Sequence, residues 1–245
     1  MSAKSVRAKL TIMSVVGGLI ASTPPALAQG VETQEEPRDW SIYARFGVGA
    51  AFANRLDQDL AYDPRVAFIV TPPNRRVTDF DAAASPTFAL GFSYPSGART
   101  ELEYRFLRPS FERVTEFGGF DPTVGPLDPT DIEPAEDFTA HFLMSNVYYE
   151  VARAGPASLF VGAGVGGGFF SNGLGARDAA FAYQGRGGVS FELSESAAIS
   201  LEYVYLRTRD LVLGPDELGV DDGFSQAAGD QFVMSGVDLS LAVRF

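Results

Sequence analysis

The stretch of sequence that decides the fold is Val237-Asp238-Leu239-Ser240-Leu241-Ala242-Val243-Arg244-Phe245. Every odd position holds an apolar side chain, and every even position holds a polar or small one. Successive side chains of a β-strand point to opposite faces of the sheet. The stretch therefore predicts a strand with one apolar face and one polar face, and the polar face carries both an acid and a base.

The same alternation recurs along most of the chain. Between Trp40 and Phe52, for example, Ile42 and Phe46 fall on one face while Arg45 falls on the other. We predict eight strands of this kind, over residues 40–52, 87–94, 101–106, 143–151, 159–165, 181–193, 199–205 and 237–245. The fold class is therefore all-β, with an even number of two-faced strands.

The connections between these strands alternate between short and long. The short ones cover residues 95–98, 152–157 and 194–197. The long ones cover residues 55–82, 109–137, 170–180 and 208–230, and they are rich in Pro, Gly and Asp. Outer-membrane barrels have tight periplasmic turns and long external loops. We therefore expect an eight-stranded antiparallel up-and-down transmembrane β-barrel, with acidic external loops that lack regular structure.

The first residues have the order of a secretory signal peptide. Three bases are followed by an apolar run over residues 10–21 and by Ala26-Leu27-Ala28, an A-x-A cleavage site before Gln29. We expect cleavage between Ala28 and Gln29 and export through the Sec pathway to the outer membrane. The expected organisation is a signal peptide (1–28), a short periplasmic segment (29–39) and a barrel (40–245).

Composition excludes several classes of function. Without residues 1–28 the chain keeps 16 Lys and Arg against 31 Asp and Glu, a formal charge of −15. Such a surface repels nucleic acid, which we exclude as a partner. The chain has no Cys, so it has no disulfide and no Cys-ligated metal. We expect no cofactor.

Aromatic side chains gather at the predicted strand ends on the apolar face, as in the interfacial girdles of membrane barrels. Toward the periplasm these are Trp40, Tyr94, Tyr149, Phe191 and Phe245. Toward the outside they are Phe52, Phe106, Phe181 and Tyr205.

The polar faces carry charges of both signs. Eight strands enclose an interior just wide enough for side chains, so these charges are expected to pair across the barrel and fill it. The predicted ion-pair network of the lumen consists of Arg45, Glu101, Glu103, Arg105, Glu150, Arg186, Glu192, Glu202, Asp238 and Arg244.

His141 is the only histidine and the only candidate for general-base catalysis. By alternation it shares a face with Leu143 and Tyr149, so we expect it to point toward lipid headgroups. The acids of the long loops match no Ca²⁺-binding spacing. We therefore expect neither a catalytic nor a metal site, and no enzyme activity.

Several short motifs carry a family resemblance. They are Met144-Ser145-Asn146-Val147-Tyr148-Tyr149-Glu150, Phe160-Val161-Gly162-Ala163-Gly164-Val165-Gly166, Phe181-Ala182-Tyr183-Gln184, Gly187-Gly188-Val189-Ser190 and the closing residues 239–245. In these motifs the chain resembles the OmpA-like and opacity-type outer-membrane β-barrels, including bacterial surface antigens. The resemblance implies insertion by the barrel-assembly machinery, with Phe245 as the assembly signal. It also implies contact with outer-membrane lipid and lipopolysaccharide, and with host or cell-surface ligands through the loops.

Three functions remain open on the sequence. The leading hypothesis is a structural, surface-antigen or adhesion protein that displays its loops from a barrel filled by ion pairs. The alternative is a narrow porin for small solutes. A lipid-modifying outer-membrane enzyme is the third, and it would depend on His141 alone.

Overall fold

The computed structural model describes residues 40–62, 70–133, 138–171, 177–213 and 225–245. The expected signal peptide (1–28), its cleavage site between Ala28 and Gln29, and the expected periplasmic segment (29–39) lie outside the described residues. No helix in the described part of the chain is long and apolar enough to cross a membrane.

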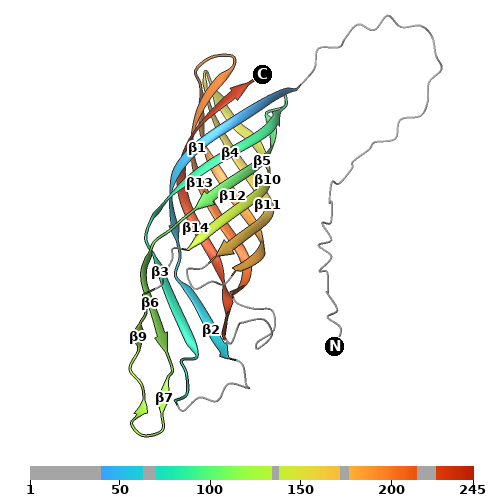
Figure 1. Ribbon diagram of the computed structural model, residues 1–245. Coiled ribbons are helices and arrows are strands. Elements are labelled where there is room, and N and C mark those ends of the chain that lie inside the picture. Colours follow the sequence, from blue (N-terminus) through green and yellow to red (C-terminus); the bar gives the residue numbers. More distant parts are fainter. Residues whose placement is uncertain (1–39, 63–69, 134–137, 172–176, 214–224) are drawn as a thin grey trace, which may run out of the picture. The chain divides into compact units, whose positions relative to one another are not determined.

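Eight of the strands formed by the described residues close into an antiparallel barrel (Figure 1). They are, in order around the ring, β1 (Ser41–Ala53), β4 (Ala83–Ser93), β5 (Ala98–Leu107), β10 (Thr139–Ala154), β11 (Ala157–Ser171), β12 (Arg177–Glu192), β13 (Ala197–Leu213) and β14 (Ser225–Arg244). The pairing of β1 with β14 closes the ring and places Val48 opposite Leu239. The eight-stranded up-and-down barrel that the sequence predicts is confirmed.

Three tight turns join β4 to β5, β10 to β11 and β12 to β13 at the same end of the barrel, which we call the turn end. The carboxyl terminus of β14 lies there too, at the top of Figure 1. In the turn after β10, Gly155 has φ +59° and is followed by Pro156. Glycine adopts this left-handed conformation without steric cost, so the chain can reverse within two residues.

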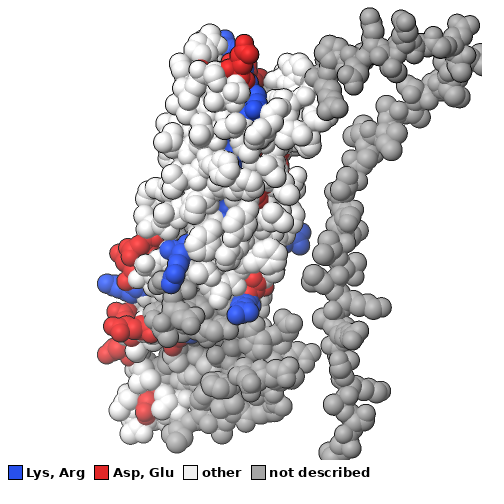
Figure 2. All heavy atoms as spheres, turned by 45° about the horizontal axis from the view of Figure 1, so that its top comes forward, with Lys and Arg blue, Asp and Glu red and all other residues white. Residues whose placement is uncertain are grey.

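The outer wall of the barrel is apolar. Phe46, Val48, Leu239 and many similar side chains expose about half of their surface on this wall. Figure 2 shows that charged side chains gather toward the two ends and that mostly uncharged ones cover the wall between them. An apolar band between polar rims is the surface that a barrel presents to lipid.

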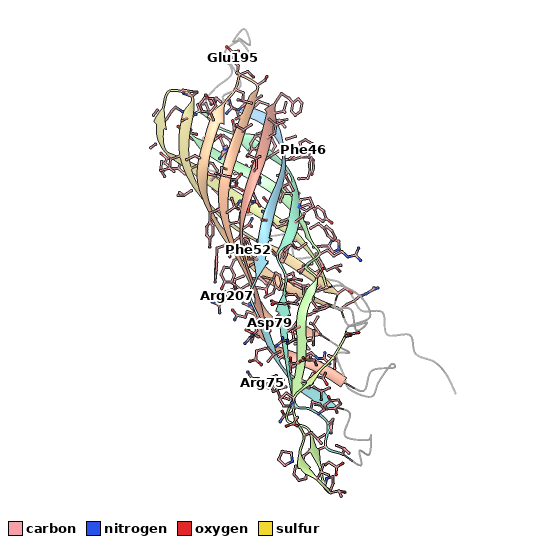
Figure 3. The ribbon with its side chains drawn as sticks, turned by 90° about the vertical axis from the view of Figure 1, so that its left-hand side faces the viewer. Phe46, Phe52, Arg75, Asp79, Glu195 and Arg207 are labelled. Atoms are coloured by element: carbon pink, nitrogen blue, oxygen red, sulfur yellow. The ribbon has the colours of Figure 1, made fainter. Side chains whose placement is uncertain are left out.

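At the opposite end of the barrel the same sheet continues in four further strands, which we call the extension sheet. It is formed by β2 (Leu56–Tyr62), β3 (Arg75–Phe80), β6 (Phe111–Phe117) and β9 (Thr130–Asp131), in that order. The first residues of β14 pair with β2, so the extension sheet continues the barrel wall (Figures 1 and 3). A short hairpin of β7 (Phe120–Asp121) and β8 (Gly125–Pro126) lies beyond it.

The expectation that the long connections lack regular structure is wrong for residues 55–82 and 109–137. Side chains of these segments are buried in the extension sheet. Leu56, Thr78 and Val114 are register partners and share one face, and Val77 is buried on the other. The expected third and fourth loops, 170–180 and 208–230, are also shorter than predicted. Strands β11 to β14 run into both of them, because apolar side chains such as Leu211 and Leu213 remain buried.

Candidate functional site

Among the residues that the structure describes, seven charged side chains are buried inside the barrel and form one connected layer, the ion-pair layer. They come from five strands, because inward positions of neighbouring strands lie side by side around the ring. The layer consists of Arg45 on β1, Glu101, Glu103 and Arg105 on β5, Arg186 on β12, Glu202 on β13 and Asp238 on β14.

Arg45 connects three carboxylates of this layer. Its Nη2 atom lies 2.6 Å from Glu101 Oε2 and 2.6 Å from Glu103 Oε2. Its Nη1 atom lies 3.4 Å from Glu202 Oε1. The planar guanidinium presents five donors in a fixed fork, which suits it to join carboxylates from different strands.

Arg186 and Arg105 complete the connection across the barrel. Arg186 pairs with Glu103, and its Nη2 atom lies 2.9 Å from Glu202 Oε2 and 3.0 Å from Asp238 Oδ2. Arg105 also pairs with Asp238, and it donates from Nη1 to Ser85 Oγ at 2.6 Å. The carboxylates of Glu103 and Asp238 are thus each shared by more than one guanidinium.

The layer holds three guanidiniums and four carboxylates among the described residues. Hydroxyl groups supply further donors to the excess carboxylate. Tyr43 donates to Glu101 Oε1 at 2.7 Å and Tyr148 donates to Glu101 Oε2 at 3.2 Å. Ser240 donates to Glu202 Oε1 at 3.0 Å. Buried charges need such partners because they have lost their water.

Three residues of the predicted network lie apart from this layer, at the turn end. Glu150, Glu192 and Arg244 are only partly buried there. Arg153, which sequence reasoning did not single out, pairs with both glutamates, and Arg244 pairs with Glu192. Arg153 Nε donates to Glu150 at 2.8 Å and Nη1 donates to Glu192 at 2.9 Å. The separation arises because these residues lie near the tight turns, where water reaches the side chains.

The turn end is hollow. Its open cavity has a volume of about 550 Å³ and is lined by residues that include Trp40, Glu150, Arg153, Glu192 and Arg244. A small cavity of about 70 Å³, lined in part by Arg99, is also present there. The guanidinium of Arg99 lies 4.7 Å from the ring centre of Phe160 and 5.2 Å from that of Tyr148.

A second interior layer, the apolar layer, lies toward the extension sheet. Its aromatic members pack closely: Phe138 and Phe232 stack with ring centres 5.7 Å apart, and Phe142 meets Phe170 edge-on at 5.5 Å. Leu107 and other aliphatic side chains complete this cluster, which is almost entirely buried. Sequence reasoning missed this layer. Its signal was present in runs such as 142–144, which is apolar on both faces of the strand.

His141 lies on the outer wall of the barrel near the extension sheet. Its Nδ1 atom is 2.7 Å from the hydroxyl of Tyr104, and its ring centre is 5.0 Å from that of Phe106. The outward position is the one that the strand alternation predicts. In the described part of the chain, no group of three or more His, Cys, Asp or Glu side chains could hold a metal ion.

Ion pairs connect neighbouring strands of the extension sheet. Arg75 on β3 donates to Asp57 on β2, with Nε 2.7 Å from Oδ1. Arg76 on β3 donates to Glu116 on β6 in the same way, at 3.0 Å. The hydrogen bond from Arg75 lowers the pKa of the Asp57 carboxyl below its usual value.

Phe245 follows β14 and is 80% exposed, with its backbone N–H donating to Ile42 O at 2.9 Å. Its role as an assembly signal stays a prediction.

We compared the sequence and the fold with those of known proteins. Residues 129–208 match the sequence model of a protein family described as "Surface antigen". Comparison with curated protein sequences gave no match. Among solved structures, the outer membrane protein OprG from Pseudomonas aeruginosa matches with a TM-score of 0.53 and 13% identity, covering 84% of this chain and 95% of that one. Neisserial surface protein A (NspA) matches with a TM-score of 0.49 and 10% identity, covering 83% and 97%.

The surface-antigen part of the resemblance is confirmed over residues 129–208, and the OmpA-like and opacity-type part stays a prediction. The protein has the fold of an outer-membrane β-barrel, and its residues 129–208 are similar to a surface-antigen family.

Proposed function

We propose that this protein is an outer-membrane barrel that displays the extension sheet outside the cell, as a surface antigen or adhesion protein. The observation that carries the proposal is the difference between the barrel interior and the extension sheet. The barrel interior is filled at two levels, whereas the extension sheet projects from the barrel end and is continuous with its wall.

The filled interior argues for display rather than transport. A solute entering from the turn end would have to part Arg45, Arg186 and Arg105 from their carboxylates, which costs several kcal/mol for each separated charge. Beyond them it would meet the apolar layer, in which Phe138 and Phe142 are fully buried. The narrow porin is therefore the less favoured function.

The extension sheet offers a binding surface on a rigid support. Most side chains of β7, β8 and β9 are at least partly exposed, and Val124 in the hairpin loop is 73% exposed. Binding residues are commonly found on segments that a rigid scaffold holds away from its core. Host or cell-surface ligands are the partners that we propose for this sheet.

A catalytic role is not part of the proposal. The ring of His141 faces outward and its hydrogen-bond partner is the phenol of Tyr104, whereas a general base would need a nucleophile or a polarised water within reach. The expected signal peptide supports export through the Sec pathway, and the barrel-assembly machinery would insert the chain.

Cysteine labelling of intact cells tests the orientation. The natural chain has no Cys, so a single introduced thiol is the only one. We expect Val124→Cys, in the hairpin beyond the extension sheet, to react with a membrane-impermeant maleimide. The matched control, Ser96→Cys in a tight turn, should react only after the outer membrane is opened. The reverse pattern would show that the extension sheet faces the periplasm.

Conductance in planar bilayers separates display from transport. We expect the purified wild-type protein to give no steady current, because both interior layers must rearrange before ions can pass. Steady single-channel steps from the wild type would instead support the narrow porin.

A further inference from the structure

Two arginines lie on the lipid-facing side of β13, at the end of the apolar wall nearer the extension sheet. Arg207 and Arg209 occupy the outward positions that follow Tyr205 on the strand. In Figure 3 the labelled Arg207 lies next to Phe52 along the barrel, between Phe52 and the extension sheet. They therefore lie where the apolar wall gives way to the polar end.

Neither arginine forms an ion pair with a carboxylate among the residues that the structure places. Arg207 donates from Nε to the side-chain oxygen of Gln231, a neutral group. The guanidinium of Arg209 lies 5.8 Å from the ring centre of Phe181. The next residue, Asp210, is exposed and pairs with neither of them. This differs from the extension sheet, where Arg55, Arg75 and Arg76 each pair with an acid.

The backbone beside the two arginines is irregular. The pairing of β13 with β14 shifts register between Arg207 and Asp210, which marks a bulge. Bulges redirect side chains and are common at barrel rims. Residues two apart on a strand have Cα atoms about 6.8 Å apart on the same face. Two long arginine side chains at that spacing can converge on one phosphate or on two neighbouring ones.

Aromatic rings surround the pair on the membrane side. Tyr183 is opposite Arg207 on β12 and is 41% exposed, and Tyr205 on β13 is 39% exposed. Such rings lie at the headgroup level of a bilayer, where an arginine can reach the phosphates. A free anion would make no favourable contact with this apolar surface, whereas the acyl chain of a lipid would pack along it.

We propose that Arg207 and Arg209 form a binding site for the phosphate groups of a phosphorylated glycolipid in the outer leaflet. Guanidinium binds phosphate through paired, charge-assisted hydrogen bonds, which are stronger than those between neutral groups. The proposal rests on the proposed orientation, in which the extension sheet faces outward.

Native mass spectrometry of the protein in micelles that contain diphosphorylated lipid A tests this site. We expect the wild type to retain lipid A, and Arg207→Gln/Arg209→Gln to bind it about tenfold more weakly or worse. Arg207→Lys/Arg209→Lys keeps the charges and should lose less affinity. The matched control is Arg75→Gln, an exposed arginine on the extension sheet, which should bind like the wild type.

Three further results test the site, and a fourth tests the proposed function. Dephosphorylated lipid A should not be retained, and an equal affinity for it would overturn the phosphate assignment. Excess inorganic phosphate should not displace lipid A, and full displacement would show a site for a free anion instead. Equal retention by the wild type and the double Gln variant would overturn the role of the two arginines. Failure of the wild type to insert into lipid vesicles would contradict the proposed function itself.

Discussion

At the scale of single residues, the charges of the ion-pair layer depend on one another. Glu103 is completely buried and shares its carboxylate with guanidiniums from β1 and β12. Removing one arginine leaves buried carboxylates without water and without a full set of partners. The resulting loss of folding free energy exceeds the net stabilisation that the intact ion pair provides.

The first prediction concerns Arg186, which contacts three carboxylates. We expect Arg186→Ala to lower the free energy of unfolding by about 3–5 kcal/mol where the site stays dry, and by less where water enters. The measurement is the urea unfolding midpoint of the folded barrel. The same variant should pass more current in planar bilayers than the wild type, because it weakens one of the two layers that block the barrel.

Arg113→Ala is the matched control for that experiment. Arg113 and its partner Asp131 are each 67% exposed and lie 4.0 Å apart, so their pairing contributes little. Equal midpoints for Arg186→Ala and the wild type, with no change in current, would refute the idea that the layer closes the barrel.

The second prediction concerns the close approach of strands at Gly49. An added Cβ there would collide with the carbonyl oxygen of Val237 and the carboxylate of Asp238. We expect Gly49→Ala to destabilise the barrel by about 1–3 kcal/mol, because the backbone has to move. Gly185→Ala has open space for its Cβ and should unfold like the wild type in the same urea titration. Similar losses in both variants would show that backbone propensity, and not the collision, sets the cost.

At the scale of the element, the stability of the extension sheet depends in part on exposed ion pairs, whose strength changes with pH. The third prediction concerns Asp57, whose pKa is lowered by the hydrogen bond from Arg75. The pair therefore stabilises the sheet above the usual carboxyl pKa of about 4, and its contribution is lost as pH falls through the lowered value. We expect amide protection factors in β2 and β3 to drop on acidification.

Asp57→Asn is the control for this pH dependence. It removes the titrating group while keeping the size of the side chain, so the protection factors of β2 and β3 should change less with pH. An unchanged pH profile in Asp57→Asn would assign the effect to another group.

The barrel strands were predictable from sequence because one face of each had to meet lipid. That constraint imposes a strict period of two, as in residues 237–245, and the tight turns leave a clear signal in pairs such as Gly155-Pro156. The extension sheet has no such constraint. In β3, for example, Val77 and Thr78 are buried in succession, so the alternation that marks a strand is lost.

The interior was predictable only in part. Charges at inward positions near the middle of long strands, such as Arg45 and Glu202, could be assigned to the lumen by alternation alone. Which charge meets which depends on the tilt of the strands, which the sequence does not reveal. The apolar layer brings together residues as distant as Phe80 and Phe232, and local periodicity holds no information on such contacts.

At the scale of the whole molecule, the closure of the ring is the property on which the others depend. The fourth prediction places a crosslink across the β1–β14 seam. Val48 and Leu239 are register partners, so Val48→Cys/Leu239→Cys should form a disulfide within one chain on mild oxidation. Gel mobility without reductant measures it.

The matched control for the crosslink is Val48→Cys/Leu201→Cys. Leu201 is the register partner of Leu239 on β13, so it lies one strand further from Val48. Strands are about 4.8 Å apart, which puts residues two strands apart beyond the reach of a disulfide. Crosslinking in the control but not across the seam would show that the barrel is not closed between β1 and β14.

The shared strand β14 also has a mechanical consequence. Its 20 residues span about 65 Å, pairing with β2 at one end and with β1 and β13 along the barrel. A tensile force on the extension sheet acts along β14, nearly perpendicular to the hydrogen bonds that hold it. Those bonds are then loaded together in shear rather than opened one after another. A cell that pulled on a bound surface through this protein would therefore strain the barrel wall as a whole.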